Sequence, residues 1–555
     1  MAFCADFETT TNPEDCRVWA WGVTEIGNTD YFVYGNTIDT FINYISAKNN
    51  ETFYFHNLKF DGEFILYYLL KNGFTHVLDK KKMKTKTFTT LISDKGVFYA
   101  MEICFYKDAN TTIKVKILDS LKILPFSVAD VAKAFKMKIN KLEIDYKEDR
   151  KIGHELTKEE IDYLHNDIVI VADALKTLFD EGLTKMTQGS NALYDYKKIL
   201  TSKKFNMYFP IPDYDADIRQ SYKGGFTYLN PKYKNKDVGA GIVLDVNSLY
   251  PSVMYYNDLP YGEGIYFEGQ YQYDKVYNLY VQMFSCQFEL KEGKIPTVQL
   301  KNNLSFCPTE YLTSSDGEYI TLCMTSVDLE LFLTNYDVYD IVYHSGWKFK
   351  SSNKLFRDYI DKWMKIKIQS TIDGNAPMRT LAKLMLNALY GKFALNPNVQ
   401  SKIPYLQDDI VKYKLGEKET RNPIYIPVGT FITAWARYKT ITSAQTVYDR
   451  FIYADTDSLH LEGTEIPHNL EISDTDLGKW KHESTFERAR FLRQKSYIEQ
   501  IKGELHITCA GMPKGCYPYV TWDNFRYGSS FDGKLTVTHA KGGIVLAERP
   551  HTLKE

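Results

Sequence analysis

The most constraining feature of the sequence is a pair of aspartates, Asp455 and Asp457, which lie two residues apart in the segment "RFIYADTDSLHLEG". The apolar residues around them predict a buried β-strand, and burying an unpaired carboxylate is costly in free energy. A divalent metal ion is the most economical reason to place two acids there. Such a site also needs a third carboxylate from elsewhere in the chain and a substrate on which the metal acts.

The bulk composition predicts a cytosolic protein of several domains. The chain has 555 residues and a net charge of −2, which excludes a uniformly basic surface. Its eight cysteines show no CxxC pair and no histidine at zinc spacing, so we expect reduced thiols. We expect neither a signal peptide nor a membrane span. Residues 354–392 carry eight basic against three acidic residues, which is typical of a solvated face or of a nucleic-acid groove.

The order of predicted elements indicates several structural units. Residues 1–185 alternate strands with helices, which favours an α/β layer. A helix is predicted to start at Thr157, which forms a capping box with Glu160, and to stop at Gly182. Farther along we expect a tyrosine-rich α+β stretch at 257–353, two helices within 354–392, a hairpin at 395–426, a helix near 430–449 and strands in the last 45 residues.

Four acids in the first part of the chain form an ordered set. Asp6 and Glu8 are two apart on a predicted strand and therefore share one face. Asp61 follows in "FHNLKFDGEF", and Tyr163 and Asp167 are four apart on the predicted helix. A single DxE pair is usually exposed surface, but the ordered combination is specific. Four carboxylates can hold two Mg²⁺ ions, which activate water and stabilise a leaving alkoxide.

This order of motifs resembles the 3′–5′ exonuclease of proofreading DNA polymerases. The resemblance implies that the four acids bind the metals, that Tyr163 positions the attacking water, and that Lys141 of "KLEI" stabilises the cleaved phosphate. It also implies a set of residues that hold the single-stranded 3′ end, namely His56, Asn57, Phe60, Phe64, Ser120, Leu121 and Tyr146.

Three further motifs resemble those of family B DNA polymerases: "DVNSLYPS", "RTLAKLMLNALYGKF" and "YADTDS". In the middle motif, helical periodicity places Leu381, Leu384, Met385 and Ala388 on a packing face, opposite a face of cations and amides. Taken alone, this could be an ordinary amphipathic helix with solvated lysines. A calcium loop starting at Asp455 is disfavoured, because positions 6 and 12 would be His460 and Ile466 instead of Gly and Glu.

The resemblance supplies the missing third carboxylate, Asp245. It implies that Asp245 and Asp457, with Val246 beside them, bind two Mg²⁺ ions for which Mn²⁺ can substitute, and that Asp455 supports the site. Tyr250 is expected to stack under the sugar and exclude a 2′-hydroxyl. The residues implied to bind the deoxynucleoside triphosphate are Val246, Tyr250, Lys367, Arg379, Lys383, Asn387 and Tyr390. Those implied to contact DNA are Tyr222, Gly224, Gly225, Gly391, Lys392, Thr433, Arg437, Lys495 and Tyr497.

Two added segments, at 257–353 and 395–426, are typical of protein-primed polymerases. With them, the chain resembles the protein-primed family B DNA polymerases of small tailed bacteriophages, the phi twenty-nine group. The resemblance implies an RNase H-like exonuclease followed by a right-hand polymerase, both α/β or α+β. The expected units are the exonuclease (1–187), palm (188–256 and 427–509), first insertion (257–353), fingers (354–394), second insertion (395–426) and thumb (510–555).

The first insertion is expected to grip a terminal protein that serves as primer, and the second to give processivity and strand displacement. We expect an otherwise monomeric enzyme, with primer-template and single-stranded DNA as partners, in the cytoplasm of an infected bacterium. No Walker A sequence is present, so a helicase has no support. Two alternatives stay open: a family B polymerase that extends only nucleic-acid primers, and a non-catalytic nucleic-acid-binding protein.

Overall fold

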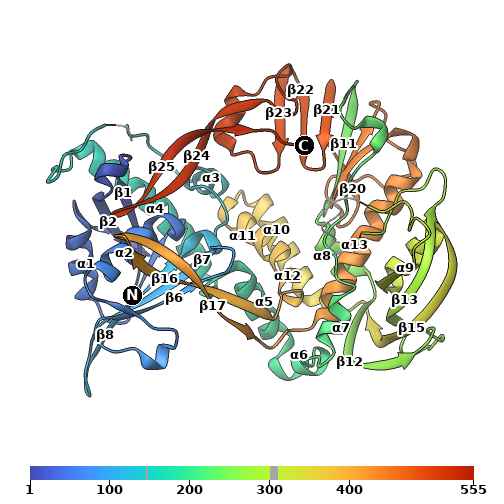
Figure 1. Cartoon of the computed structure of the whole chain (residues 1–555), viewed down its shortest axis with the longest axis horizontal. Coiled ribbons are helices and arrows are strands. Elements are labelled where there is room, and N and C mark those ends of the chain that lie inside the picture. The colour runs from blue at the N-terminus through green and yellow to red at the C-terminus, as the bar shows by residue number, and fades with distance from the viewer. Residues whose placement is uncertain (140, 146–147, 300–310) are drawn as a thin grey trace.

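The N-terminal part of the chain (blue in Figure 1) is built on an eight-stranded mixed sheet. Its strand order is β3-β2-β1-β4-β8-β7-β6-β5. The computed structural model describes residues 1–139, 141–145, 148–299 and 311–555. Strand β1 pairs in parallel with β4, and β4 with β8, as an α/β layer requires. The strands span Ala2–Thr9 (β1), Val18–Glu25 (β2), Asn28–Gly35 (β3), Glu51–Phe55 (β4), Thr75–His76 (β5), Thr87–Ile92 (β6), Phe98–Lys107 (β7) and Thr112–Asp119 (β8).

Helix α4 (Lys158–Asp180) packs against β1 and β2 and begins where the sequence predicts. The Thr157 side chain accepts a hydrogen bond from the backbone N–H of Glu160, and the Glu160 carboxylate accepts one from the backbone N–H of Thr157. Gly182 follows the helix with a φ of 75°. The capping box and the glycine stop are therefore confirmed. The other helices of this unit are Ile38–Ser46 (α1), Leu58–Lys71 (α2) and Val128–Ala134 (α3).

The YADTDS motif lies on a second, five-stranded sheet with the order β20-β11-β19-β18-β9. Its long backing helix α13 (Ile426–Thr446) begins a few residues earlier than predicted, because Pro427 suits the first turn of a helix. Three helices, α5 (Gln188–Leu200), α6 (Ser202–Tyr208) and α7 (Asp215–Arg219), lead from the first sheet to this one. The other elements are Thr227–Leu229 (β9), Gly241–Val246 (β11), Leu249–Tyr256 (α8), Phe451–Asp455 (β18), Ser458–Glu462 (β19) and Trp480–Phe486 (β20).

The predicted α+β stretch at 257–353 forms a four-stranded sheet of its own, in the order β12-β15-β13-β14, covered by α9 (Ser326–Asn335). Phe284, Phe288, Phe332 and Tyr336 form a separate core between the sheet and this helix. The strands are Leu259–Glu268 (β12), Leu279–Leu290 (β13), Ile320–Thr325 (β14) and Tyr336–Ser352 (β15).

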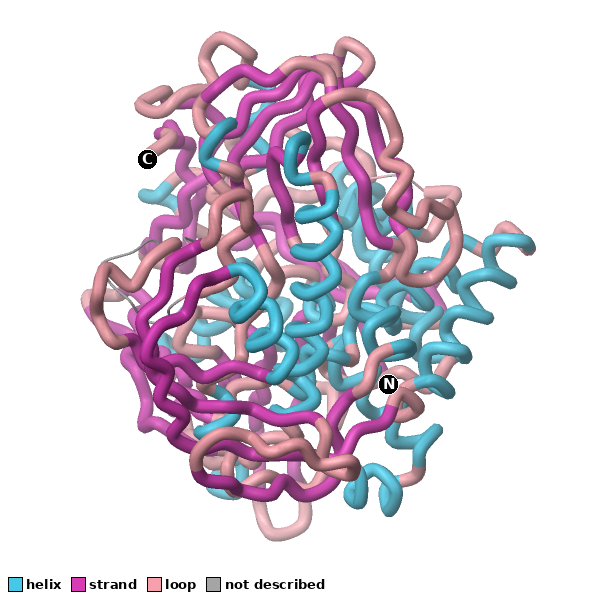
Figure 2. Tube along the Cα trace, turned by 90° about the vertical axis from the view of Figure 1, so that its right-hand side faces the viewer, coloured by secondary structure: helices cyan, strands magenta, loops and turns pink. Residues whose placement is uncertain are grey.

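The two helices predicted within 354–392 are α10 (Arg357–Ile372) and α11 (Ala376–Ala388), followed by a short third helix, α12 (Tyr390–Phe393). In Figure 2 the helices fill the centre and one side of the molecule, and the strands lie mainly at the top and along the other side. Leu381, Ala382, Met385 and Leu386 are the buried residues of α11. The packing face is therefore close to the predicted one, but slightly rotated.

Two long hairpins reach back to the N-terminal unit (Figure 1). The predicted hairpin is β16 (Asn398–Gln407) with β17 (Ile410–Thr420), and the second is β24 (Ser530–Ala540) with β25 (Gly543–Thr552). Tyr413 on the first hairpin donates a hydrogen bond to Glu63 of α2 at 2.6 Å. Asp409 at its tip lies 2.6 Å from the Lys71 ammonium and 3.1 Å from that of Lys541, which belongs to the turn of the second hairpin. Both hairpins are thus tied to α2 and to each other.

A further four-stranded sheet has the order β10-β21-β22-β23, in which β10 precedes β11 in the sequence and the other three strands lie between β20 and β24. Its strands are Lys236–Val238 (β10), Arg488–Arg493 (β21), Ser496–Ile501 (β22) and Glu504–Cys509 (β23). The change from the five-stranded to the four-stranded sheet falls between Phe486 and Arg488, within the range 427–509 of the predicted second part of the palm. Among the described residues, no helix is both long and apolar enough to cross a membrane.

Candidate active sites

The first candidate site is an acidic cavity in the N-terminal unit. Asp6 and Glu8 point from one face of β1, Asp61 comes from the first turn of α2, and Asp167 comes from α4. All four line one cavity of about 810 Å³, together with Tyr163. The structure therefore brings together the acids that are scattered over 160 residues of sequence.

Burial controls the electrostatics of this cavity. Burial, with a contribution from Asp167, raises the pKa of Asp6 to about 7. Burial and the neighbouring acids also raise the pKa of Glu8 and that of Asp61 well above their ordinary values. Burial also raises the pKa of Asp167, and the Lys141 ammonium, 3.3 Å from Asp167 Oδ2, opposes this increase. So many acids in one cavity need further positive charge to be ionised together.

The donor atoms of the cavity suit a divalent cation. Asp61 Oδ1 and Asp167 Oδ1 are buried and accept no hydrogen bond within the described part of the chain. Among the described residues, no three acidic, histidine or cysteine side chains already form a compact ligand cluster. Carboxylate oxygens are the ligands that Mg²⁺ and Mn²⁺ prefer. The carboxylate oxygens of this cavity are therefore suitable ligands for a divalent metal ion.

The residues predicted to hold a single strand divide into two groups. His56, Asn57 and Phe60 line the cavity. Phe64 and Ser120 are instead 2% and 0% exposed, and the Ser120 hydroxyl donates to the Phe55 carbonyl. Their burial favours a supporting role over the predicted direct contact. The Leu121 backbone N–H donates to Asp119 at 2.9 Å, and Tyr146 lies outside the described residues.

The cavity has a wall that the sequence analysis missed. Leu535, Leu546 and Glu548 of the C-terminal hairpin β24–β25 line it beside the N-terminal acids. These residues belong to no local motif, and more than 360 residues of chain separate them from the acids. Only the tertiary fold could have identified them.

The second candidate site lies on the five-stranded sheet. Asp245 near the end of β11 pairs with Ser458 of β19, and Asp455 pairs with the same serine from β18. Asp457 sits in the turn between β18 and β19, and its carbonyl accepts a hydrogen bond from the Val246 backbone N–H at 2.8 Å. Burial, with Asp457 adding to it, raises the pKa of Asp245 to about 7. Burial also raises the pKa of Asp457. This pair of acids therefore favours a cation between them.

Asp455 is already engaged by protein groups. Its Oδ1 lies 3.0 Å from the Lys495 ammonium and accepts from the Thr227 hydroxyl at 3.1 Å. Its Oδ2 accepts from the Tyr453 hydroxyl at 3.2 Å, and the Tyr453 oxygen accepts from the Lys495 backbone N–H at 2.9 Å. Asp455 therefore fixes the Lys495 ammonium at the second site, and its supporting role there stays a prediction.

Cations gather on the helices opposite these acids. Arg379, Lys383 and Asn387 are exposed on one side of α11. Burial lowers the pKa of Lys367 on α10, and the nearby charges of Lys383, Arg379 and Lys481 lower it further. A polyanion would relieve this repulsion. Lys481 was missed by the sequence analysis, and on β20 it is the cross-strand partner of Asp245.

Two tyrosines close the space between the sheet and the helices. The rings of Tyr250 and Tyr390 stack with their centroids 4.0 Å apart. Thr456 lies so close to Gly225 that a side chain there would collide with it, which explains the glycine in the YxGG element. The role of this stacked aromatic pair in binding a nucleotide stays a prediction.

Two of the predicted DNA contacts prove to be internal. Thr433 is 1% and Arg437 is 5% exposed. The Arg437 guanidinium binds both carboxylate oxygens of Asp328, at 3.0 and 2.7 Å, and donates to the Lys223 and Gly224 carbonyls, each at 2.8 Å. Arg437 is therefore buried and binds the YxGG element, and its contact with a DNA strand stays a prediction.

The remaining predicted DNA contacts lie around the second site. Lys392 donates to the Ser190 hydroxyl at 3.2 Å, and burial lowers its pKa. Tyr497 on β22 packs against Tyr453, with ring centroids 5.2 Å apart, and Tyr453 is the residue whose hydroxyl donates to Asp455. Tyr222, Gly224 and Gly391 are partly or fully exposed.

These two acidic centres, on separate sheets and with cationic helices facing the second one, define a nucleic-acid polymerase with an additional nuclease-like centre. A family model described as DNA polymerase type B, organellar and viral, matches residues 42–155 and 142–475. The chain therefore belongs to the organellar and viral type B DNA polymerases. It is a DNA-directed DNA polymerase of the bacteriophage type. Enzymes of this family use divalent metal ions.

Individual relatives agree with this assignment. The chain is 46% identical to the DNA polymerase of Bacillus phage phi29, over 100% of this chain and 99% of that one. It is 34% identical to the DNA polymerase of Streptococcus phage Cp-1, over 100% and 98%. The solved phi29 DNA polymerase in its orthorhombic crystal form matches with a TM-score of 0.95 at 46% identity, covering 100% of both chains. Its ternary complex with primer-template DNA and incoming nucleotide substrates matches with a TM-score of 0.94 at 45% identity, again covering 100% of both.

Proposed function

We propose that the chain replicates a linear phage genome, starts synthesis on a hydroxyl group of a terminal protein, and edits its product in the N-terminal centre. The observation that carries this proposal is the presence of both acidic centres with two added folded units, at 257–353 and 395–426, in one chain. The phi29 enzyme has been solved with single-stranded DNA and with primer-template DNA and nucleotides. We extend these ligands to this chain.

For synthesis, Asp245, Asp457 and Val246 would hold two Mg²⁺ ions, for which Mn²⁺ could substitute. When bound, such ions make a hydroxyl more acidic and neutralise charge on a leaving pyrophosphate. Asp455 contributes through Lys495, whose ammonium it holds at 3.0 Å. The lysine is then directed at the primer terminus.

The incoming nucleotide is held between the helices and the aromatic wall. Lys367 and Lys383, with Arg379 and Asn387 on the same side, bind the triphosphate because they form the cationic group opposite the acids. Tyr390 and Tyr250 stack at 4.0 Å. Tyr250 lies under the sugar and leaves no room for a 2′-hydroxyl, which selects deoxynucleotides.

For editing, Asp6, Glu8, Asp61 and Asp167 would hold a second pair of divalent ions in the N-terminal cavity. Tyr163, which lines the same cavity, orients the attacking water. The single strand enters past the residues that line this cavity, among them His56, Asn57 and Phe60. Lys141 is 3.3 Å from Asp167 and stabilises the released phosphate.

The two added units serve priming and processivity. The sheet β12–β15 has its own core, and a domain of this kind offers a surface for a terminal protein. The hairpin β16–β17 bridges α2 and the C-terminal hairpin, which supports closure around a template strand. We propose the unit boundaries given by the sequence analysis, an otherwise monomeric enzyme, and the host cytoplasm as its location.

Labelled dATP, Mg²⁺ and a purified candidate terminal protein test the priming step when no DNA primer is present. We expect label on the terminal protein with the wild type and none with Asp457→Asn. An oligonucleotide primer in a parallel reaction measures ordinary extension. The terminal proteins to be tested are those of a phage that encodes this chain. If the oligonucleotide is extended but none of these proteins becomes labelled, the result would favour a polymerase that extends only nucleic-acid primers.

A further inference from the structure

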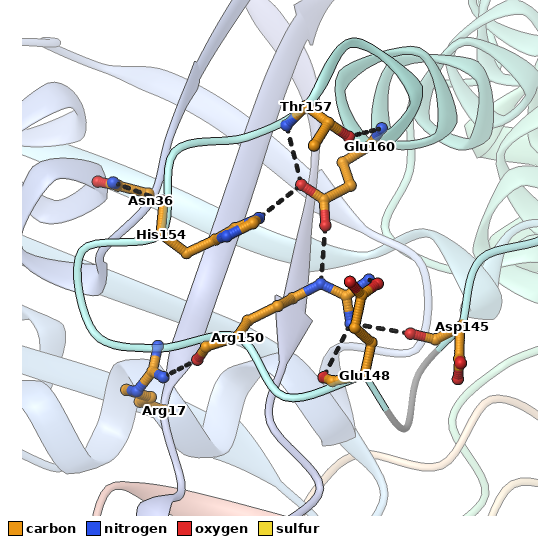
Figure 3. A network of polar contacts seen from close by, with 8 residues as sticks. All are labelled: Arg17, Asn36, Asp145, Glu148, Arg150, His154, Thr157 and Glu160. Carbon is orange, nitrogen blue, oxygen red and sulfur yellow. Dashed lines mark hydrogen bonds and ion pairs between the residues drawn. The ribbon is translucent and has the colours of Figure 1, made fainter.

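The segment between the acidic cavity and helix α4 is held in place by one buried arginine, Arg150. In the described part of 141–157 the backbone forms neither helix nor strand, although this segment supplies Lys141 to the cavity. Arg150 Nη1 donates to the carbonyls of Asp145, at 2.8 Å, and Glu148, at 3.2 Å (Figure 3). Its own carbonyl accepts a hydrogen bond from Arg17. Hydrogen bonds of Arg150 thus fix the backbone of this segment in place of the regular hydrogen bonds of a helix or sheet.

The same guanidinium joins the segment to the start of α4. Arg150 Nε donates to Glu160 Oε1 at 2.8 Å, and the side chains are only 3% and 7% exposed. Glu160 Oε2 accepts from the Thr157 backbone N–H at 2.9 Å and lies 2.7 Å from His154 Nε2 (Figure 3). Glu160 is therefore the common anchor of the segment and of the capping box.

This anchor is close to the catalytic face of the helix. Glu160, Tyr163 and Asp167 are three and four residues apart and so lie on one side of α4. The Arg150 guanidinium also stacks over the Trp19 ring of β2, 4.1 Å from the ring centroid. Strand β2 pairs with β1, the strand that carries Asp6 and Glu8. Arg150 therefore contacts the segment, the helix and the sheet that together form the cavity.

We infer that Arg150 is a positioning residue of the editing centre, which acts by holding Lys141 against Asp167. The inference rests on the proposed editing function. Arg150 itself does not line the cavity and touches no substrate. Its partners all belong to the N-terminal unit, so the second acidic centre does not depend on it. Loss of Arg150 should consequently affect degradation and leave synthesis intact.

Single-turnover degradation of a single strand and DNA-primed synthesis, measured on one preparation, test this inference. We expect Arg150→Met to lower the degradation rate by roughly 10- to 100-fold, since misplacement by about 1 Å can cost about two orders of magnitude. We expect the strand concentration for half-maximal rate to change much less. Arg150→Lys keeps the positive charge but not the forked geometry of the guanidinium. Its degradation rate should therefore lie between that of the wild type and that of Arg150→Met. Lys176→Met removes a cation from the exposed side of the same helix and should leave both activities unchanged.

A double variant distinguishes positioning from general destabilisation. If Arg150 acts through Lys141, Arg150→Met combined with Lys141→Met should degrade within about twofold of the rate of Lys141→Met alone, because effects within one network do not add. The inference would be overturned if the fold-losses of the two single variants multiplied in the double variant. It would also be overturned if Arg150→Met lost degradation and synthesis equally, or if it degraded DNA normally. If Arg150→Met does not fold, Arg150→Lys decides the question with the same measurements. Degradation that survives Asp6→Ala with Glu8→Ala would refute the editing function itself, independently of Arg150.

Discussion

Arg437 offers a direct test of the distinction between a DNA contact and an internal support. Its guanidinium is 5% exposed and binds both oxygens of Asp328. Arg437→Met would leave Asp328 as an uncompensated buried charge, and breaking a buried pair in this way costs about 3–5 kcal/mol. For a cooperative unit of about 150–250 residues, this corresponds to a fall in Tm on the order of 10 °C. The carbonyls of Lys223 and Gly224 would also lose their donor.

Thermal unfolding and the salt dependence of primer-template binding measure the two possibilities separately. We expect a large fall in Tm for Arg437→Met and an unchanged slope of log K against log salt, because no phosphate contact is lost. Asp328→Leu combined with Arg437→Met should recover much of the stability, since no charge is then left buried. A normal Tm together with a slope reduced by about one would refute the reasoning and restore Arg437 as a phosphate contact.

The other predictions concern the two centres and the first hairpin. Asp457→Asn should lower primer extension by about a thousandfold, equivalent to about 4 kcal/mol of transition-state stabilisation, and leave degradation of single strands intact; near-normal extension would remove the metal assignment. Asp6→Ala with Glu8→Ala should abolish 3′–5′ degradation but not synthesis, because the acids line a cavity on a separate sheet. Tyr250→Val should admit ribonucleotides, measured by competing ribo- and deoxynucleoside triphosphates; unchanged discrimination would exclude Tyr250 as the gate. Deletion of 398–420 should preserve single-nucleotide insertion but shorten products on nicked circular DNA under an enzyme trap, whereas equal product lengths would show the hairpin to be passive.

Local sequence rules were sufficient for much of the fold. The Thr157–Glu160 capping box and the glycine stop fix both ends of α4 by hydrogen bonds within a few residues. The alternation of "CADFETT" fixed which side chains share a face of β1. Local rules were less exact at two places: α13 starts earlier than predicted, although Pro427 suits a first turn, and tertiary packing rotates the buried face of α11 slightly.

The sequence alone predicted that Asp6 and Glu8 share one face of a strand and that Tyr163 and Asp167 share one face of a helix, because these spacings point side chains in one direction whatever surrounds them. It could not determine which of the predicted contact residues are exposed. Arg437 and Ser120 lie in motifs typical of DNA contacts, yet Asp328 and the Phe55 carbonyl hold them inside the protein. Leu546 belongs to no motif and still lines the acidic cavity. The physical reason is that a side chain's exposure is set by partners from distant parts of the chain, and only the tertiary structure brings those partners together.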